Sequence, residues 1–325
     1  MLEYVKLLFY VLVFPGLIFC FFIGLFLLGI DRKIVARMQK RIGPPIIQSF
    51  YDFFKLVGKE KIIPSRAAKK TYIIAPIIGL LSIITISLFI PINQFTTGFN
   101  SYADLIVIIY LLAIPALAII IGGASSGSTF AGIGASREVV LMIGYELPLI
   151  IILLTVVWKI GILTGTNVTF SLLNIVNYQL QNGPLILTWS LIPAAISFLM
   201  IIPCEIGTTP FDIAEAETEI CGGPLVEYGG FNLGLYKLTQ GIKIFIMISL
   251  FIALFASGVI PVALTANIFV NLLWHILLVV IIVFFVISLL RSITARVRIE
   301  QAFKFFWTYP TILSVLSLIL VWIGL

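Results

Sequence analysis

Residues 7–30 read LLFYVLVFPGLIFCFFIGLFLLGI, a run with no charged side chain. A helix needs about 20 apolar residues to cross the roughly 30 Å hydrocarbon core of a bilayer, so this run is long enough to span a membrane. A basic segment follows it and a small-residue cleavage site does not, which predicts a retained span and not a removed signal peptide.

The rest of the chain has the same character. Of its 325 residues, 61% are hydrophobic and only 10% are charged, and the mean hydropathy is +1.20. Soluble domains carry roughly a quarter charged residues. This composition excludes a soluble fold, a disordered chain and a small disulfide scaffold.

Seven further apolar runs follow the first, and they lack the alternation of a membrane β-barrel. We therefore predict an all-α polytopic membrane protein with about eight transmembrane helices, forming one membrane domain over residues 1–325. The predicted spans are 7–30, 73–92, 103–122, 139–158, 185–203, 236–257, 268–290 and 306–323. Residues 46–57 alternate apolar and polar side chains at helical spacing, which predicts an amphipathic helix in the membrane interface or docked on a partner.

The loop charges predict the orientation. Most of the 20 basic residues lie in the predicted loops 31–72, 123–138 and 291–305, whereas the opposite face carries Lys6 and Lys159. By the positive-inside rule these loops, together with 204–235, face the cytoplasm. Both termini are then expected on the non-cytoplasmic side of the cell membrane. The same bias explains the net charge of +6, so no nucleic-acid partner is expected.

Other sequence patterns predict no site. The three cysteines are isolated from one another and His275 is the single histidine, so neither an iron–sulfur cluster nor a zinc site is indicated. Residues 123–127 fit G-x-S-x-G, but the topology places Ser125 and His275 at opposite ends of their spans, so close packing of small residues is the favoured interpretation. Gly132 and Gly134 lack the third glycine of a dinucleotide loop.

The predicted loop 204–235 differs from the other three because it is acidic. It contains no basic residue, and the fourth span also carries an acid, Glu146. The acids of this group are Glu146, Glu205, Asp212, Glu215, Glu217, Glu219 and Glu227. A helix capped by Thr209 and starting at Pro210 would give Asp212, and in part Glu215, a structural role near its N-terminus.

The remaining acids lack that explanation. A carboxylate at membrane depth costs a few kcal/mol and by default marks an ion or proton pathway, and clustered carboxylates raise one another's pKa. Proton or cation handling is therefore the favoured interpretation. Pairing of Glu146 with a base inside the membrane and a site for a hard cation remain as alternatives.

These residues form a recognisable pattern. PFDIAEAETE at 210–219 with VEY at 226–228 resembles the most distinctive signature of the subunit 1 family of respiratory complex I. DRK at 31–33 with RIGP at 41–44, GYE at 144–146 and ARVRIEQ at 295–301 resemble other motifs of that family, in the same order. The likeness covers nearly the whole chain.

The resemblance implies a proximal membrane anchor that binds no cofactor itself. Its acids would couple electron transfer in a peripheral arm to proton or sodium translocation in neighbouring subunits. Basic residues would dock that arm or line the entrance to the carboxylate chain; they are Arg32, Arg37, Arg137, Arg291, Arg296 and Arg298. The implied partners are hydrogenase-like and iron–sulfur subunits of the peripheral arm, antiporter-like and small membrane subunits, and the bilayer.

Three departures resemble the membrane-bound NiFe hydrogenases and their sulfur-reducing relatives. They are the compact GPPIIQ at 43–48, the acid in SRE at 136–138, and CGGP at 221–224. That branch oxidises ferredoxin, so iron–sulfur clusters and a NiFe centre are expected in partner subunits. A quinone-reducing complex I subunit is the alternative within the family, and a stand-alone secondary transporter is the alternative of another class, although no internal repeat supports the latter.

Overall fold

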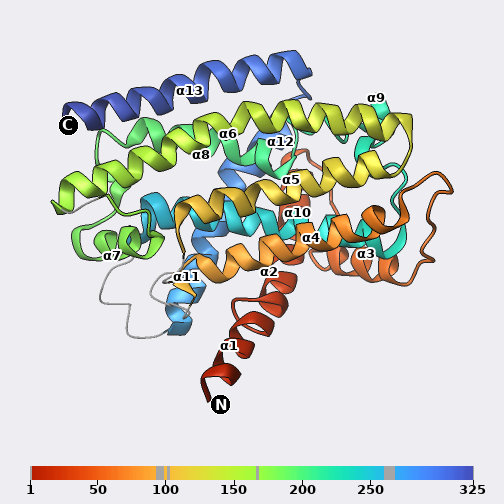
Figure 1. The fold of residues 1–325 in the computed structure, drawn as a ribbon, viewed down its shortest axis with the longest axis horizontal. Coiled ribbons are helices and arrows are strands. Elements are labelled where there is room, and N and C mark those ends of the chain that lie inside the picture. Colours follow the sequence, from red (N-terminus) through yellow and green to blue (C-terminus); the bar gives the residue numbers. More distant parts are fainter. Residues whose placement is uncertain (1, 93–98, 101–102, 166–167, 260–267, 325) are drawn as a thin grey trace.

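The computed structural model describes residues 2–92, 99–100, 103–165, 168–259 and 268–324 (Figure 1). Throughout these ranges every regular element is a helix, and seven helical segments are long and apolar enough to cross a membrane. The prediction of an all-α polytopic membrane protein is confirmed. The main helices are α2 (Leu17–Met38), α4 (Lys69–Phe89), α5 (Leu105–Ser125), α6 (Thr129–Thr164), α10 (Gly230–Phe251), α11 (Ile268–Ile282) and α13 (Ile299–Ile323).

The first predicted span contains two helices. After α1 (Leu2–Leu12) the chain turns at Pro15 and Gly16, and α1 leaves the bundle at an angle in Figure 1. The turn requires glycine, since a Cβ on Gly16 would lie 1.9 Å from the Val11 carbonyl oxygen. Proline also cannot donate a helical hydrogen bond. The uninterrupted helix predicted over 7–30 is therefore wrong.

Two of the later spans contain widened turns. α10 continues into a π-helical turn, η4 (Ile252–Ala256), and α11 continues through η7 (Val283–Ser288) into α12 (Leu289–Ile293). A π turn changes the backbone hydrogen-bond pattern. The buried Gln179 amide, on α7 (Leu172–Asn182), donates from Nε2 to the carbonyl oxygens of Ala253 at 2.8 Å and Leu254 at 3.0 Å.

The fifth predicted span is shorter than expected. Residues 185–203 begin with a 3₁₀ turn, η2 (Leu185–Leu187), and the helix itself is α8 (Ile192–Ile206). Its 15 residues extend over only about 22 Å at 1.5 Å per residue, less than the roughly 30 Å of a hydrocarbon core. The last turn of α8 therefore ends among the other helices, and it carries Glu205, which is buried there.

The connecting loops are also shorter than predicted. The loop assigned to 123–138 is reduced to residues 126–128, and that assigned to 291–305 to residues 294–298. In both places the polar end of a helix continues beyond its apolar run, which hydropathy alone does not detect. Residues 210–216 form no helix, so the predicted start at Pro210 is wrong; the Pro210 carbonyl instead accepts a hydrogen bond from the Val297 N–H.

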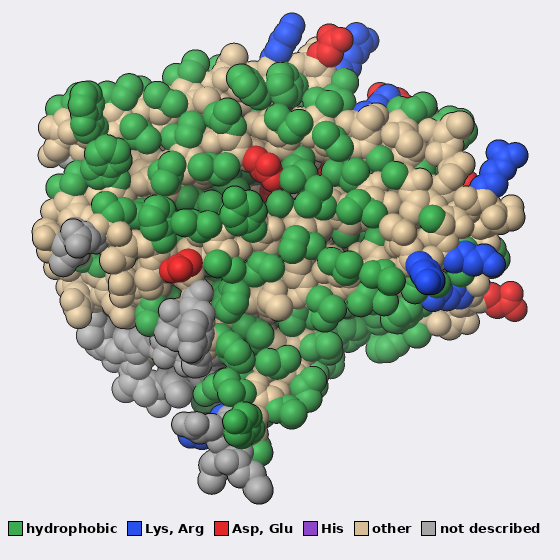
Figure 2. Space-filling view, in the orientation of Figure 1, with side chains coloured by type: hydrophobic (Ala, Val, Ile, Leu, Met, Phe, Trp, Pro, Cys, Tyr) green, Lys and Arg blue, Asp and Glu red, His purple; other side chains and the backbone are tan. Residues whose placement is uncertain are grey.

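The charged loops gather at one end of the bundle, here termed the charged end, where residues 39–68, 126–128, 207–229 and 294–298 connect the helices. In Figure 2 the Lys and Arg side chains lie mainly along the right-hand and upper right edges, and the broad middle is hydrophobic. The predicted amphipathic helix is confirmed as α3 (Gln48–Val57). Its Phe50 and Phe53 rings pack on Phe21 with centroid distances of 6.2 and 5.1 Å.

Three tyrosines fix the acidic loop to the bundle. The rings of Tyr72 and Tyr228 stack with centroids 4.1 Å apart, and the Tyr72 hydroxyl donates to the Glu227 carbonyl oxygen at 2.6 Å. The Tyr236 hydroxyl donates to the Ala118 carbonyl oxygen at 2.9 Å. Because burial outweighs hydrogen bonds from neighbouring groups, the pKa of Tyr228 is raised, and its neutral hydroxyl stays available as a donor.

This cluster depends on a glycine in α5. A Cβ on Gly122 would lie 2.2 Å from the Tyr236 hydroxyl oxygen and 2.7 Å from that of Tyr228. We expect Gly122→Ala to lower the free energy of unfolding by about 1–3 kcal/mol, the usual cost of overpacking. Thermal unfolding in detergent checks this, with Gly132→Ala as control because no atom lies within 4 Å of a Cβ there. Equal midpoints for the two variants would contradict the prediction.

Candidate functional site: two connected cavities lined by ion pairs

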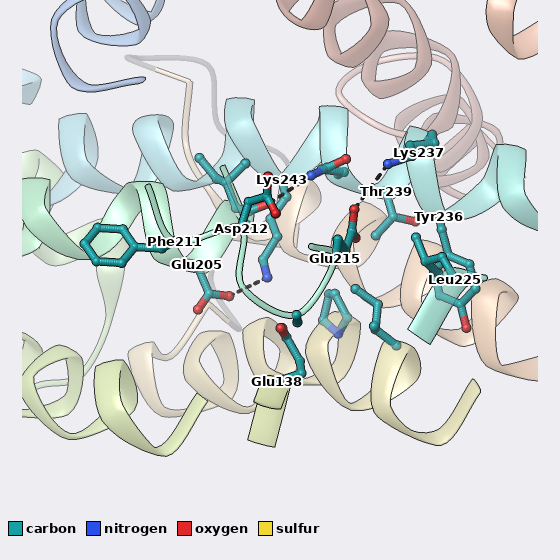
Figure 3. Close-up of a pocket in the computed structure, with 16 residues that line it drawn as sticks. Glu138, Glu205, Phe211, Asp212, Glu215, Leu225, Tyr236, Lys237, Thr239 and Lys243 are labelled. Atoms are coloured by element: carbon teal, nitrogen blue, oxygen red, sulfur yellow. Dashed lines mark hydrogen bonds and ion pairs between the residues drawn. The ribbon is translucent and has the colours of Figure 1, made fainter. Parts of the chain in front are cut away.

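A small polar cavity lies where α6, α8 and α10 meet the loop 207–229 (Figure 3). Its volume of about 40 Å³ is sufficient for water. We name it the inner cavity. Its polar lining residues are Glu138, Glu205, Asp212, Glu215, Lys237, Thr239, Gln240 and Lys243.

The inner cavity contains a buried ion pair. Lys243 Nζ, from α10, lies 2.7 Å from Glu205 Oε1 at the end of α8, and the two side chains are 7% and 1% exposed. The contact lies outside the angles of a hydrogen bond, so charge attraction carries it. Removing one partner of such a pair is strongly destabilising because it leaves a buried charge without compensation.

A second carboxylate enters the cavity from the opposite side. Glu138 projects from α6 toward the Glu205–Lys243 pair in Figure 3. Three helices therefore bring two acids and one base to the same water-sized space.

A larger cavity lies between the inner cavity and the charged end, with a volume of about 590 Å³. We name it the outer cavity. Its charged lining residues are Asp31, Arg32, Asp52, Asp212, Glu215, Glu217, Lys237, Arg291 and Arg296. Charged groups thus make up a large part of its wall, unlike a typical apolar ligand pocket.

Ion pairs hold the wall of the outer cavity together. The buried Asp31 carboxylate on α2 accepts hydrogen bonds from Ser288 Oγ at 2.7 Å and Arg291 Nη1 at 2.6 Å, which ties α2 to the segment η7–α12. Arg32 Nη1 donates to Asp52 Oδ2 on α3 at 2.8 Å. Burial raises the pKa of Asp52, but hydrogen bonds from Arg32 and Gln48 outweigh burial and leave that pKa lowered.

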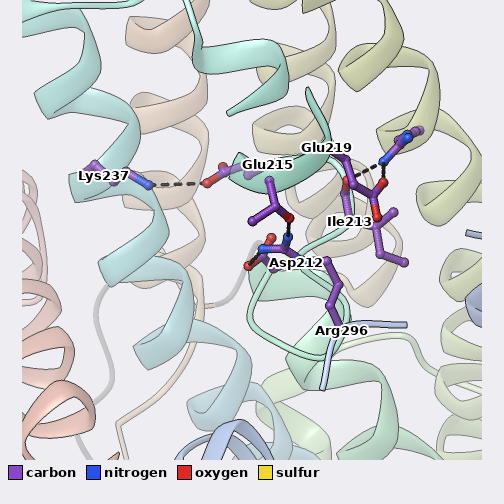
Figure 4. Close-up of polar contacts among 8 residues, drawn as sticks. Asp212, Ile213, Glu215, Glu219, Lys237 and Arg296 are labelled. Atoms are coloured by element: carbon purple, nitrogen blue, oxygen red, sulfur yellow. Dashed lines mark hydrogen bonds and ion pairs between the residues drawn. The ribbon is translucent and has the colours of Figure 1, made fainter. Parts of the chain in front are cut away.

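The two cavities share part of their walls. Asp212, Glu215, Lys237 and Gln240 line both of them. Lys237 Nζ lies 3.3 Å from Glu215 Oε2, and Arg296 Nη2 donates to Asp212 Oδ2 at 2.8 Å (Figure 4). A series of ionisable groups therefore extends from the charged end to Glu205.

Two acids of the loop 207–229 have opposite pKa shifts. Burial raises the pKa of Asp212, and the Arg296 guanidinium offsets only part of this effect. A hydrogen bond from Arg137 Nη1 at 2.6 Å lowers the pKa of the exposed Glu219. Arg137 also donates to the Ile213 carbonyl oxygen at 3.4 Å, so it holds the loop at two points.

These shifts predict a separation of the two titrations. Asp212 should take up its proton at a higher pH than an ordinary aspartate, and Glu219 at a lower pH than an ordinary glutamate. An infrared-detected pH titration of Asp212→Asn and Glu219→Gln against the unmodified protein checks this. Asp212→Asn should remove absorbance change on the alkaline side of the usual carboxyl range, and Glu219→Gln on the acidic side; the reverse order would contradict the assignment.

The structure brings together most of the predicted site residues, but not all. Glu205, Asp212, Glu215 and Glu217 line the two cavities, as do Arg32, Arg291 and Arg296. Glu219 and Arg137 pair beside them. Four predicted residues line neither cavity: Glu146, Glu227, Arg37 and Arg298.

Glu146 occupies a separate place on α6. It is half-buried in an apolar groove of about 270 Å³ between α5 and α6, beside Tyr110 and Ile150. The base inside the membrane that was considered as its partner is Lys243, which pairs with Glu205. Within the described ranges no group of three or more His, Cys, Asp or Glu side chains is placed to hold a metal ion.

Five charged residues of the site were not predicted: Asp31, Asp52, Glu138, Lys237 and Lys243. A signal for the two lysines was present, because both lie within an apolar run where an ionisable side chain is functional by default. Glu138 was noted as an unusual acid, but its direction on α6 depends on where that helix begins.

Comparison with known proteins identifies the family. The profile of the NADH dehydrogenase family matches residues 10–322. The chain belongs to the NADH dehydrogenase subunit 1 family. A relative from Allorhizobium ampelinum, a membrane subunit of NADH-quinone oxidoreductase, is 30% identical over 311 residues, covering 92% of this chain and 89% of its own.

The family also includes relatives of the hydrogenase type. Hydrogenase-4 component C of Escherichia coli is 37% identical over 227 residues, covering 70% of this chain and 69% of its own. Among solved structures, one chain of the membrane-bound sulfane sulfur reductase, an archaeal respiratory membrane complex, matches with a TM-score of 0.86 and 30% identity. The match covers 98% of this chain and 99% of that one. The expected family, with its quinone-type and hydrogenase-type members, is confirmed.

Proposed function

We propose that this subunit anchors the peripheral arm of a complex-I-like respiratory complex and couples electron transfer in that arm to proton or sodium translocation. The observation that carries the proposal is the series of ionisable groups in the two connected cavities, which reaches from the charged end to the buried Glu205–Lys243 pair. Such groups inside a membrane domain are costly and by default functional. The subunit itself performs no redox chemistry in this scheme.

The lining of the outer cavity favours the ferredoxin-oxidising, hydrogenase-type branch. A quinone carries a long apolar tail, and sites for such ligands are lined mainly by apolar side chains. The outer cavity instead carries nine charged residues, a wall suited to water and ions. Reduction of quinone is the alternative, and inhibition of the intact complex by a quinone-site inhibitor would favour it.

The partners and orientation follow from the same proposal. The charged end would face the cytoplasm, with both termini on the opposite side of the cell membrane. Hydrogenase-like and iron–sulfur subunits would dock there and hold the iron–sulfur clusters and a NiFe centre. Antiporter-like and small membrane subunits would pack against the apolar sides of the bundle.

Reconstitution of the native complex in liposomes tests the proposal. With reduced ferredoxin as the electron donor, the unmodified complex should move ions across the membrane as it turns over. Glu205→Gln keeps the side-chain volume but removes the charge, so electron transfer should continue while ion movement is lost. The control is Glu300→Gln, an exposed acid in the first turn of α13. Full ion movement by Glu205→Gln, or transport by the isolated subunit, would refute the coupling role.

A further inference from the structure

The inner cavity holds an excess of one acid over its bases. Asp212 is paired with Arg296 and Glu215 with Lys237, so these two acids are neutralised where they lie. Lys243 is paired with Glu205. No ion pair is formed by Glu138 among the described residues, although it lines the same cavity.

Charge balance then decides the protonation of the cavity. If Glu138 and Glu205 were both ionised, one ammonium group would face two carboxylates in a space almost closed to water. An uncompensated buried charge is so costly that a group takes up or releases a proton instead. The groups that face Glu138 from the surrounding elements are Glu205, Glu215, Lys243, Tyr145 and Cys204. Tyrosine and cysteine are ordinarily neutral at pH 7 and supply no positive charge.

We infer that the inner cavity stores one proton, shared between Glu138 and Glu205, and that Lys243 pairs with whichever of the two carboxylates is ionised. The inference rests on the proposed coupling function and adds to it a defined storage site and a moving counter-charge. With the proton on Glu138, the cavity has the pairing seen here, in which Lys243 lies 2.7 Å from Glu205 Oε1.

The exchange of the proton is balanced and conserves charge. The O–H bond of Glu138 breaks, its proton passes through water in the 40 Å³ cavity, and an O–H bond forms on Glu205. The Lys243 ammonium then moves from the neutralised Glu205 to the ionised Glu138. Lysine suits this role because its charge is compact, its stem is flexible and its three donors rotate freely. Its contact with Glu205 is not directional, so no hydrogen bond holds it in place.

Infrared spectroscopy of the intact purified complex at neutral pH tests this directly, because a protonated carboxyl group has a C=O absorption distinct from that of a carboxylate. Each of Glu138→Gln and Glu205→Gln should remove the absorption of one protonated carboxyl. After either change, Lys243 and the remaining acid form a fully ionised pair. The double variant should lose no more than either single variant. Glu300→Gln should leave the absorption unchanged.

Several outcomes would overturn the inference. A single variant that retains the full absorption would show that the proton is not shared, and a double variant with twice the loss would show two independent protons. If Glu138→Gln fails to assemble, Glu138→Asp replaces it, and its carboxyl band should shift in position with its area unchanged. A band unaltered in both position and area would contradict the assignment.

The measurement is separate from the test of the coupling function. Absence of ion movement in the unmodified complex would refute the coupling role whatever the infrared spectrum shows. Intact ion movement without a shared protonated carboxyl would refute only the storage site.

Discussion

Lys243→Met should be the most destabilising single substitution in the inner cavity. It removes the one ammonium group beside the buried Glu205 carboxylate, and breaking a buried ion pair by removing one partner costs about 3–5 kcal/mol. The thermal unfolding midpoint of the purified protein in detergent measures the effect.

A double-mutant cycle separates the loss of the pair from the loss of packing. Glu205→Gln combined with Lys243→Met leaves no buried charge at that pair, so it should recover most of the stability lost by Lys243→Met alone. Lys243→Arg keeps the positive charge and should cost less than Lys243→Met. Additive losses in the double variant would mean that the two side chains do not depend on each other.

Arg296→Ala should impair attachment of the peripheral arm and turnover together. The change removes the hydrogen bond from Arg296 Nη2 to Asp212 Oδ2 and the one from Nη1 to Thr218 Oγ1 at 3.3 Å. Hydrogen bonds to charged groups contribute about 1.5–3 kcal/mol each, which corresponds to about a tenfold or larger loss of affinity if the released loop forms part of the docking surface. Retention of peripheral subunits after purification, and ferredoxin-driven turnover, measure the two effects.

The neighbouring arginine provides the control for this prediction. Arg298 is exposed at the start of α13 and lines neither cavity, so Arg298→Ala should leave turnover nearly unchanged. If both variants retain the peripheral subunits equally well, Arg296 has no particular role in attachment.

The architecture was predictable because hydropathy reports directly on membrane spans. Apolar runs located the helices, and the placement of basic residues correctly grouped the loops at one end. The interruption at Pro15 and the shortness of α8 were missed, because an apolar run does not reveal where its backbone stops being helical. The helix expected from Pro210 was also missed, since the Pro210 carbonyl bonds instead to Val297, far along the chain.

The acids of the site were easier to predict than their partners. Glu205 and Asp212 stood out as acids in an unexpected place, whereas Lys243 is recognised as a partner only once the rotation of α10 against α8 is known. Glu138 and Glu146 illustrate the same limit. They are eight residues apart on α6, which places them about 80° apart around the helix and about 12 Å along it. One therefore faces the inner cavity and the other a lateral groove.

The length of α8 has a consequence for the choice of lipid. Because α8 has only 15 residues, the depth of its Glu205 end depends on the thickness of the surrounding bilayer. Lipids with short acyl chains bring the headgroups nearer to that end, and longer chains move them away, since a bilayer and a short helix adjust to each other at modest cost. Acyl-chain length should therefore set how readily water reaches Glu205 and Lys243, and with it the efficiency of energy conversion by the assembled complex.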